Sequence, residues 1–97
     1  MRKIFLAALL AATLGCTVPT TDTTVTAYTA EWCRQCQIDR PALDALNGRV
    51  PVTLIDVDAQ PELARQHSVR TLPTYIVFEH GIEVFRTHSL ADALSRF

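Results

Sequence analysis

The sequence predicts an α/β fold in which a four-stranded mixed sheet with flanking helices forms in the order β-α-β-α-β-β-α. Three observations carry this prediction. Strand-like and helix-like segments alternate, and the near-continuous hydrophobic run at residues 52–57 is typical of a parallel strand covered on both faces. The pair His80-Gly81, between two later strand-like runs, predicts a tight hairpin turn that adds an antiparallel strand.

Each predicted element has a local signal. The predicted strands cover residues 25–29, 52–57, 74–79 and 82–86, and the predicted helices cover residues 32–46, 61–67 and a last segment after Ser89. Asn47-Gly48 supplies a stop for the first helix, and Pro61 suits the first turn of the second. Ser89 is the expected cap of the last helix, with Asp92 three residues on. The expected buried stripe of that helix consists of Leu90, Ala93, Leu94 and Phe97.

Length and charge limit the possible functions. The chain has 97 residues, which is enough for one small domain. Its formal net charge of −1 gives no electrostatic reason to expect binding to nucleic acid.

The first residues have the pattern of an export signal. Arg2 and Lys3 form a positive start, residues 4–14 form an uncharged apolar run, and the small residues Thr13 and Gly15 are spaced as a signal peptidase requires. The run is shorter than the roughly 20 residues that a transmembrane helix needs. We therefore expect residues 1–16 to direct export. A buried helix of the folded domain is the alternative.

Cys16 follows Gly15 at the end of this signal. The pair resembles the lipoprotein box of bacteria, in which the cysteine is lipidated and becomes the mature N-terminus, although Thr13 and Leu14 reverse the preferred order. The resemblance implies a lipid anchor at Cys16, and cleavage by the ordinary signal peptidase is the alternative. Residues 17–24 are polar and rich in threonine, so we expect them to form a tether, with the folded domain at residues 25–97.

The chemical centre of the sequence is Trp32-Cys33-Arg34-Gln35-Cys36, where the first predicted strand gives way to a helix. Two cysteines with this spacing can close a disulfide within one helical turn. Unpaired N–H groups and the helix dipole favour a thiolate at the helix N-terminus, so Cys33 is the candidate nucleophile. Cys36 is the candidate resolving thiol of a thiol–disulfide exchange.

Two other uses of the cysteine pair remain to be considered. A structural zinc ion needs four ligands, and the remaining candidates show no paired spacing, so we expect no metal site. Those candidates are Cys16, His67, His80 and His88. A disulfide with a purely structural role is the stronger alternative for an exported protein.

From residue 25 onward the sequence resembles the thioredoxin family. Ala30-Glu31-Trp32-Cys33 matches the family's approach to its active site, and Pro41 matches the proline within the active-site helix. The further matches are Val57-Asp58, Pro61, residues 69–74, Phe78, Gly81 and Val84. The resemblance implies a small thioredoxin-like fold whose redox group is the Cys33–Cys36 disulfide. It implies no cofactor, protein thiols and disulfides as substrates, and a redox partner protein.

The resemblance also implies a substrate-binding surface. The family's proline in this sequence context is cis and faces the disulfide, which implies a cis bond at Pro73. The backbone of Leu72 would then be exposed to pair with an extended substrate. Trp32 is expected beside Cys33 on the same surface, and packing in the core is its alternative.

Two departures from the family pattern concern the redox site. Ala27 stands where the family often has a buried aspartate, and Leu54 stands where a lysine commonly accompanies it. Arg34 and Gln35 replace the common Gly-Pro between the cysteines and are expected to tune the redox potential. The positive charge of Arg34 favours the Cys33 thiolate, so we expect a more oxidising disulfide than that of a typical thioredoxin.

These features predict a protein-disulfide oxidoreductase of the bacterial cell envelope, on its periplasmic side and anchored to the membrane. A soluble periplasmic or secreted form is the alternative location. A non-catalytic binding or accessory module with a structural disulfide is the alternative function. The family's first strand has no counterpart here, so the strand at 52–57 is expected to form an open sheet edge.

Overall fold

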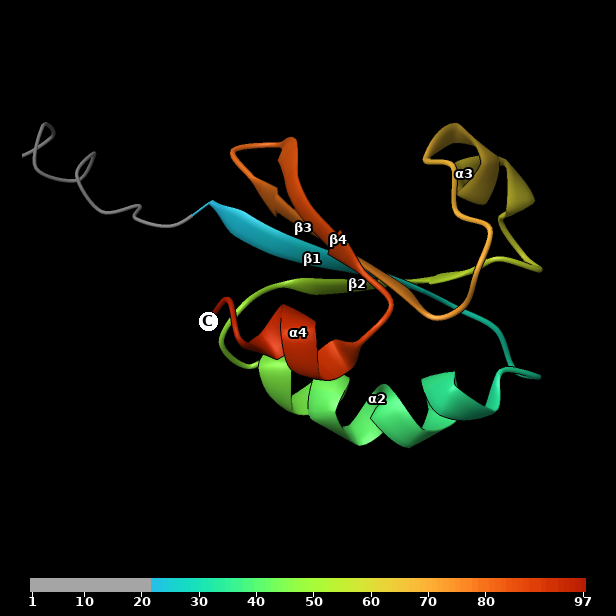
Figure 1. Cartoon of the computed structure of the whole chain (residues 1–97), viewed down its shortest axis with the longest axis horizontal. Coiled ribbons are helices and arrows are strands. Elements are labelled where there is room, and N and C mark those ends of the chain that lie inside the picture. Colours follow the sequence, from blue (N-terminus) through green and yellow to red (C-terminus); the bar gives the residue numbers. More distant parts are fainter. Residues whose placement is uncertain (1–21) are drawn as a thin grey trace, which may run out of the picture.

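The computed structural model describes residues 22–97, which fold into one sheet with three helices around it (Figure 1). The elements are β1 (Thr23–Thr29), α2 (Arg34–Leu46), β2 (Val52–Asp56), α3 (Pro61–Gln66), β3 (Thr74–Glu79), β4 (Ile82–Thr87) and α4 (Leu90–Leu94). The predicted α/β class, the mixed sheet and the element order are confirmed.

The strands lie in the order β2-β1-β3-β4. β1 pairs in parallel with β2 and antiparallel with β3, and β3 pairs antiparallel with β4. The parallel pair needs the crossover that α2 supplies, whereas β3 and β4 need a short turn only. Among the described residues, β2 therefore forms one edge of the sheet, as predicted, and β1 lies inside it.

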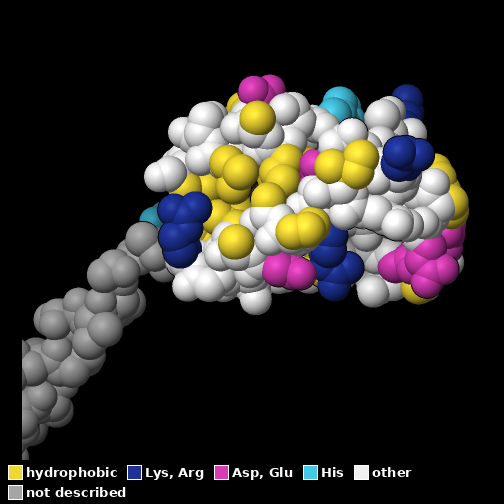
Figure 2. Space-filling model, turned by 90° about the horizontal axis from the view of Figure 1, so that it is seen from below, with side chains coloured by type: hydrophobic (Ala, Val, Ile, Leu, Met, Phe, Trp, Pro, Cys, Tyr) yellow, Lys and Arg dark blue, Asp and Glu magenta, His cyan; other side chains and the backbone are white. Residues whose placement is uncertain are grey.

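The hydrophobic core is divided between the two faces of the sheet. Successive residues of a strand point to opposite faces, so Ala27 and Tyr75 pack toward α2 and α4 whereas Tyr28 and Ile76 pack toward α3. The first core cluster contains Ala27, Leu43, Tyr75, Leu90 and Ala93, and the second contains Tyr28, Ile55, Ala64 and Ile76. Seen from the α2 and α4 side, hydrophobic side chains gather on the surface, with acidic and basic side chains around them (Figure 2).

The first helix begins two residues later than predicted. Cys33 has extended dihedral angles, with φ of −87° and ψ of 105°, so it is the N-cap of α2 and not a residue inside it. The helix continues past Pro41 to Leu46, and Asn47 is its C-cap. The Asn47 side-chain oxygen accepts a hydrogen bond of 2.8 Å from the backbone N–H of Val52 at the start of β2.

The first strand begins two residues earlier than the expected start of the domain. Thr23 and Thr24 pair with Glu79 and Phe78 of β3, so the end of the expected 17–24 tether is part of the sheet. The export signal and Cys16 lie outside the described residues. Within residues 22–97, no helix is both long and apolar enough to span a bilayer.

The hairpin and the last helix follow their sequence signals with one exception. His80 and Gly81 both have positive φ, at 55° and 81°, which is the geometry of a two-residue hairpin turn. The Ser89 hydroxyl caps α4 by accepting from the N–H of Asp92. Phe97 was expected in the buried stripe, and this is wrong. α4 ends at Leu94, and Phe97 lies beyond its C-cap with 40% of its surface exposed.

The C-terminus and the start of α2 lie at opposite ends of the sheet (Figure 1). β1 enters at one end and runs the length of the sheet to the loop that precedes α2 (Figure 1). The C-terminus lies at the end where β1 enters. The segment with the two cysteines is therefore at the far end from the start of β1 and from the C-terminus.

Candidate redox-active site

Cys33 and Cys36 form a disulfide at the N-terminus of α2, with their Cα atoms 5.3 Å apart. β1 leads directly into this segment. The backbone N–H of Cys33 donates a 3.1 Å hydrogen bond to the carbonyl oxygen of Ala30. Both cysteines are almost fully buried. The disulfide therefore lies at the junction of a central strand and a helix, as the sequence predicts.

The two sulfur atoms are not equivalent. The backbone N–H of Cys36 donates a 3.2 Å hydrogen bond to Sγ of Cys33. This N–H is one of those that have no partner within the helix, and the helix dipole adds positive potential at the same place. The first turn of α2 carries no acidic side chain that would oppose it. After reduction, negative charge is therefore favoured on Cys33 over Cys36.

The loop before β3 lies against the disulfide. Leu72 packs on the cluster formed by Ala30, Cys33 and Cys36. The Leu72–Pro73 peptide bond is cis, as predicted, and Pro73 is buried. The ring nitrogen Nδ1 of His88 lies 3.1 Å from the Pro73 carbonyl oxygen, so the end of β4 supports this loop.

Trp32 is 69% exposed, so its alternative role in the core is wrong. Its indole N–H donates a 2.9 Å hydrogen bond to the carboxylate of Asp58. Asp58 is positioned in turn by Asp56, whose side chain accepts the N–H of Asp58 over 2.8 Å. The loop after β2 thus holds a large aromatic ring in solvent beside the disulfide.

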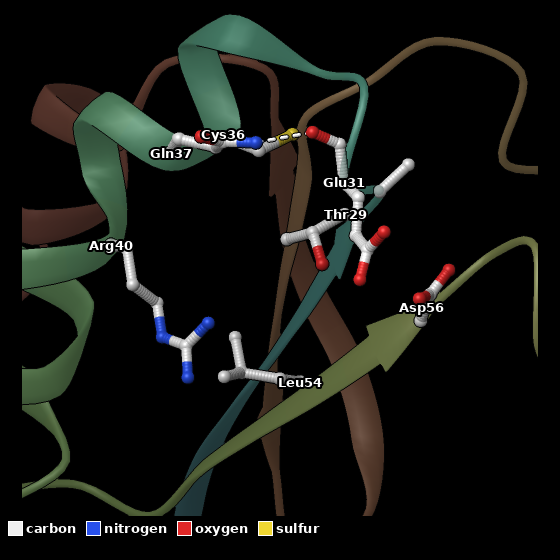
Figure 3. Close-up of a pocket in the computed structure, with 8 residues that line it drawn as sticks. Thr29, Glu31, Cys36, Gln37, Arg40, Leu54 and Asp56 are labelled. Atoms are coloured by element: carbon white, nitrogen blue, oxygen red, sulfur yellow. Dashed lines mark hydrogen bonds between the residues drawn. The ribbon is translucent and has the colours of Figure 1, made fainter.

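A cavity of about 550 Å³ reaches Cys36 from the β2 side. Figure 3 shows Arg40 of α2 on one side of it, and Glu31 and Asp56 on the other. Leu54 also lines it, and the Gln37 side chain donates a hydrogen bond to the Glu31 carbonyl (Figure 3). Water can therefore approach the resolving cysteine from the open edge of the sheet.

Comparison with known proteins decides the family. The Thioredoxin family profile matches residues 12–95. The protein belongs to the thioredoxin family. A thioredoxin of Chlamydia trachomatis is 43% identical over 68 residues, which are 67% of this chain and 67% of the relative. A Halobacterium salinarum thioredoxin mutant is 32% identical with a TM-score of 0.68, covering 77% of this chain and 70% of that one. The Fasciola hepatica thioredoxin is 28% identical with a TM-score of 0.71, covering 93% and 92%.

Family membership and the Cys33–Cys36 disulfide make this thioredoxin-family protein a thiol–disulfide oxidoreductase. Thioredoxins act on protein disulfides and use no cofactor besides their own redox disulfide. Among residues 22–97, no group of three or more His, Cys, Asp or Glu side chains is placed to hold a metal ion.

The two residues that depart from the thioredoxin pattern are neighbours. Ala27 of β1 and Leu54 of β2 are register partners, and Tyr75 of β3 lies opposite Ala27 on its other side. The Tyr75 hydroxyl donates a 2.6 Å hydrogen bond to Oδ2 of Asp39 in α2. Burial and the Asp39 carboxylate both raise the pKa of Tyr75 well above its ordinary value.

The residues between the cysteines lie on the surface. Arg34 is exposed, so solvent screens its charge. The Gln35 amide donates a 2.9 Å hydrogen bond to Oδ1 of Asp39. Asp39 was not predicted as part of the site. Its spacing offered a signal, because it lies three residues after Cys36 on the buried face that continues to Leu43.

Proposed function

We propose that this thioredoxin-family protein exchanges disulfides in proteins of the bacterial cell envelope while a lipid at Cys16 anchors it to the membrane. The observation that carries the proposal is the Gly15-Cys16 pair directly after a basic start and an apolar run. The shape of the domain supports it. The anchor would enter at the end of the sheet that is far from the disulfide, so the redox site would face away from the membrane (Figure 1).

In the proposed reaction, the Cys33 thiolate attacks one sulfur of a substrate disulfide, and the other substrate sulfur leaves as a thiolate. Cys36 then loses its proton to water and attacks Sγ of Cys33. The second substrate thiolate leaves, and the Cys33–Cys36 disulfide closes. The substrate gains the two electrons that the dithiol loses, and the reverse sequence oxidises a substrate. The hydrogen bond from the Cys36 N–H supports Cys33 as the attacking sulfur.

We further propose that Trp32, Leu72 and Pro73 form the substrate-binding surface. Leu72 packs on the disulfide cluster, and the exposed Trp32 ring is held beside it by Asp58. An extended substrate chain can pair with the Leu72 backbone while an apolar side chain rests on the indole ring.

Cell fractionation in a bacterial host tests the anchor. The full-length wild type is expected in the membrane fraction, and Cys16→Ala is expected in the soluble periplasmic fraction. A wild type that is already soluble after signal cleavage would refute the lipid anchor. Insulin-disulfide reduction measures the activity of both forms, with Cys33→Ser as the inactive control. The activity should not depend on Cys16.

A further inference from the structure

Asp39 is the one charged residue that is buried among residues 22–97, with 9% of its surface exposed. Oδ2 accepts the Tyr75 hydroxyl and Oδ1 accepts the Gln35 amide. Both carboxyl oxygens therefore have a hydrogen-bond donor, as a buried carboxylate requires. A buried charge is costly and is kept only where its hydrogen bonds are supplied.

This carboxylate lies one helical turn from the resolving cysteine. Cys36, Asp39, Leu43 and Leu46 form the buried face of α2. Residues three apart on one helix face have Cβ atoms about 5–6 Å apart. The hydrogen bond to Gln35 also joins Asp39 to the segment between the two cysteines. The Asp39 carboxylate thus places negative charge about one helical turn after Cys36, whereas the helix N-terminus favours negative charge at Cys33.

We propose that the Asp39 carboxylate, held by Tyr75 and Gln35, raises the pKa of the Cys36 thiol in the reduced protein. Cys36 then stays protonated while Cys33 is the attacking thiolate. Asp39 acts through its charge and not by contact with the reacting sulfurs, so it is a positioning residue. The inference builds on the proposed roles of the two cysteines. Its test measures the ionisation of the Cys36 thiol and requires neither activity nor export.

Other charged groups also face Cys36 and influence the pKa of its thiol. Glu31, Arg40 and Asp56 line the cavity that reaches Cys36, and Arg34 precedes it on the helix surface. Those four are exposed to solvent or border the cavity, so water screens them more than it screens Asp39. They are the same in Cys33→Ser with and without Asp39→Asn, so their effects cancel in that comparison.

The test follows the Cys36 thiol directly. In full-length Cys33→Ser with isotope-labelled cysteine, the NMR signal of the Cys36 Cβ is recorded against pH and is distinguished from that of Cys16. Adding Asp39→Asn is expected to lower the pKa of Cys36 by about one pH unit or more. Adding Asp44→Asn, an exposed carboxylate of the same helix, is expected to change it by less than about 0.3.

Tyr75→Phe separates the charge of Asp39 from the packing around it. The variant removes one hydrogen-bond donor to Asp39. Added to Asp39→Asn, in which the charge is already gone, Tyr75→Phe is expected to leave the pKa of Cys36 where Asp39→Asn left it. A further fall as large as that caused by Asp39→Asn would show that the packing of the network sets the pKa, and would overturn the proposal. An unchanged pKa in Asp39→Asn would overturn it as well.

The wild type supplies a measurement that does not depend on the stability of a variant. The side-chain carboxyl signal of Asp39 is expected to shift with pH as Cys36 titrates in the reduced protein, and not to shift over that range in the oxidised protein. If the Asp39 carboxyl signal does not shift as Cys36 titrates, the proposal is contradicted. Failure of the membrane anchor would leave this result unaffected, so the two proposals can fail separately.

Discussion

At the scale of single residues, one hydrogen bond distinguishes the two cysteines. The N–H of Cys36 points at Sγ of Cys33, so the backbone of α2 stabilises charge on the first cysteine and not on the second. Arg34, from which we expected an oxidising shift, is exposed and its charge is screened. The buried carboxylate of Asp39 opposes the same shift. We therefore predict that Arg34 and Asp39 shift the redox potential in opposite directions.

We predict that Cys36→Ser accumulates mixed disulfides with protein substrates and that Cys33→Ser does not. Cys33 can attack in the first variant, but no thiol is left to release the product. Both variants are made in the Cys16→Ala background, so that no third thiol contributes. Non-reducing electrophoresis and mass spectrometry of the adducts are the measurement. Similar amounts of adduct from both variants would contradict the assignment of the two roles.

A second residue-scale prediction concerns Asp58. Asp58→Ala removes the acceptor for the Trp32 indole N–H, so the ring becomes mobile. We expect the KM for a protein disulfide to rise several-fold, since one hydrogen bond contributes about 0.5–1.5 kcal/mol. The free energy of unfolding is expected to change by about 0.5 kcal/mol or less.

Asp44→Ala is the matched control for this prediction, because it removes an exposed carboxylate that does not bond to Trp32. Exchange of the indole N–H with solvent, followed by NMR, reports the hydrogen bond independently of activity. An indole N–H that remains equally protected in Asp58→Ala would show that another group holds the ring.

At the scale of elements, the order along the chain was predictable because each element has a local signal. The bounds were less predictable, since they depend on backbone angles and on pairing. Cys33 caps α2 because its backbone is extended, and Thr23 joins β1 because β3 is long enough to pair with it. The link between Asp39 and Tyr75 spans 36 residues, and no local pattern indicates such a contact. The site's two cysteines were predictable, whereas Asp39, Asp58 and His88 required the fold.

We predict that the amides of β2 differ in their hydrogen exchange according to the direction in which they point. The N–H of Val57 bonds to Thr29 of β1, and N–H groups alternate along a strand. The N–H groups of Thr53 and Ile55 therefore face β1, whereas those of Leu54 and Asp56 face the open edge.

In a monomeric sample of the full chain, the amides of Leu54 and Asp56 are expected to exchange much faster than those of Thr53 and Ile55. The Val52 N–H also faces the edge, but it donates a hydrogen bond to the Asn47 side chain, so its exchange should be slower. It serves as an internal comparison, because Asn47→Ala removes this bond and should speed the exchange of the Val52 amide. Uniform protection along β2 would show that another segment or partner covers the edge.

At the scale of the whole molecule, the oxidised protein has few groups that ionise in alkali. The one lysine of the sequence is Lys3, and the two tyrosines are Tyr28 and Tyr75. Burial raises the pKa of Tyr28, and burial together with Asp39 raises that of Tyr75. The folded protein therefore holds tyrosine protons that the unfolded chain releases near pH 10.0.

We predict that the oxidised protein loses stability as the pH rises above about 10. The folded state binds more protons than the unfolded state there, so the free energy of unfolding falls with pH. Tyr75 alone contributes a slope of up to about 1.4 kcal/mol per pH unit. Urea denaturation at a series of pH values measures this slope, and Tyr75→Phe should make it shallower. A wild-type stability that stays constant to about pH 12 would show that the tyrosines ionise freely in the folded protein.

The placement of the C-terminus at the far end of the sheet from the disulfide has a practical consequence. A partner joined genetically to the C-terminus, or a surface to which the C-terminus is coupled, meets the domain at the end opposite Cys33 and Cys36. Trp32 and the loop around Pro73 then remain open to large substrates. The domain is therefore suited to immobilisation on beads and to fusion with a targeting module at its C-terminus without obstruction of its redox site.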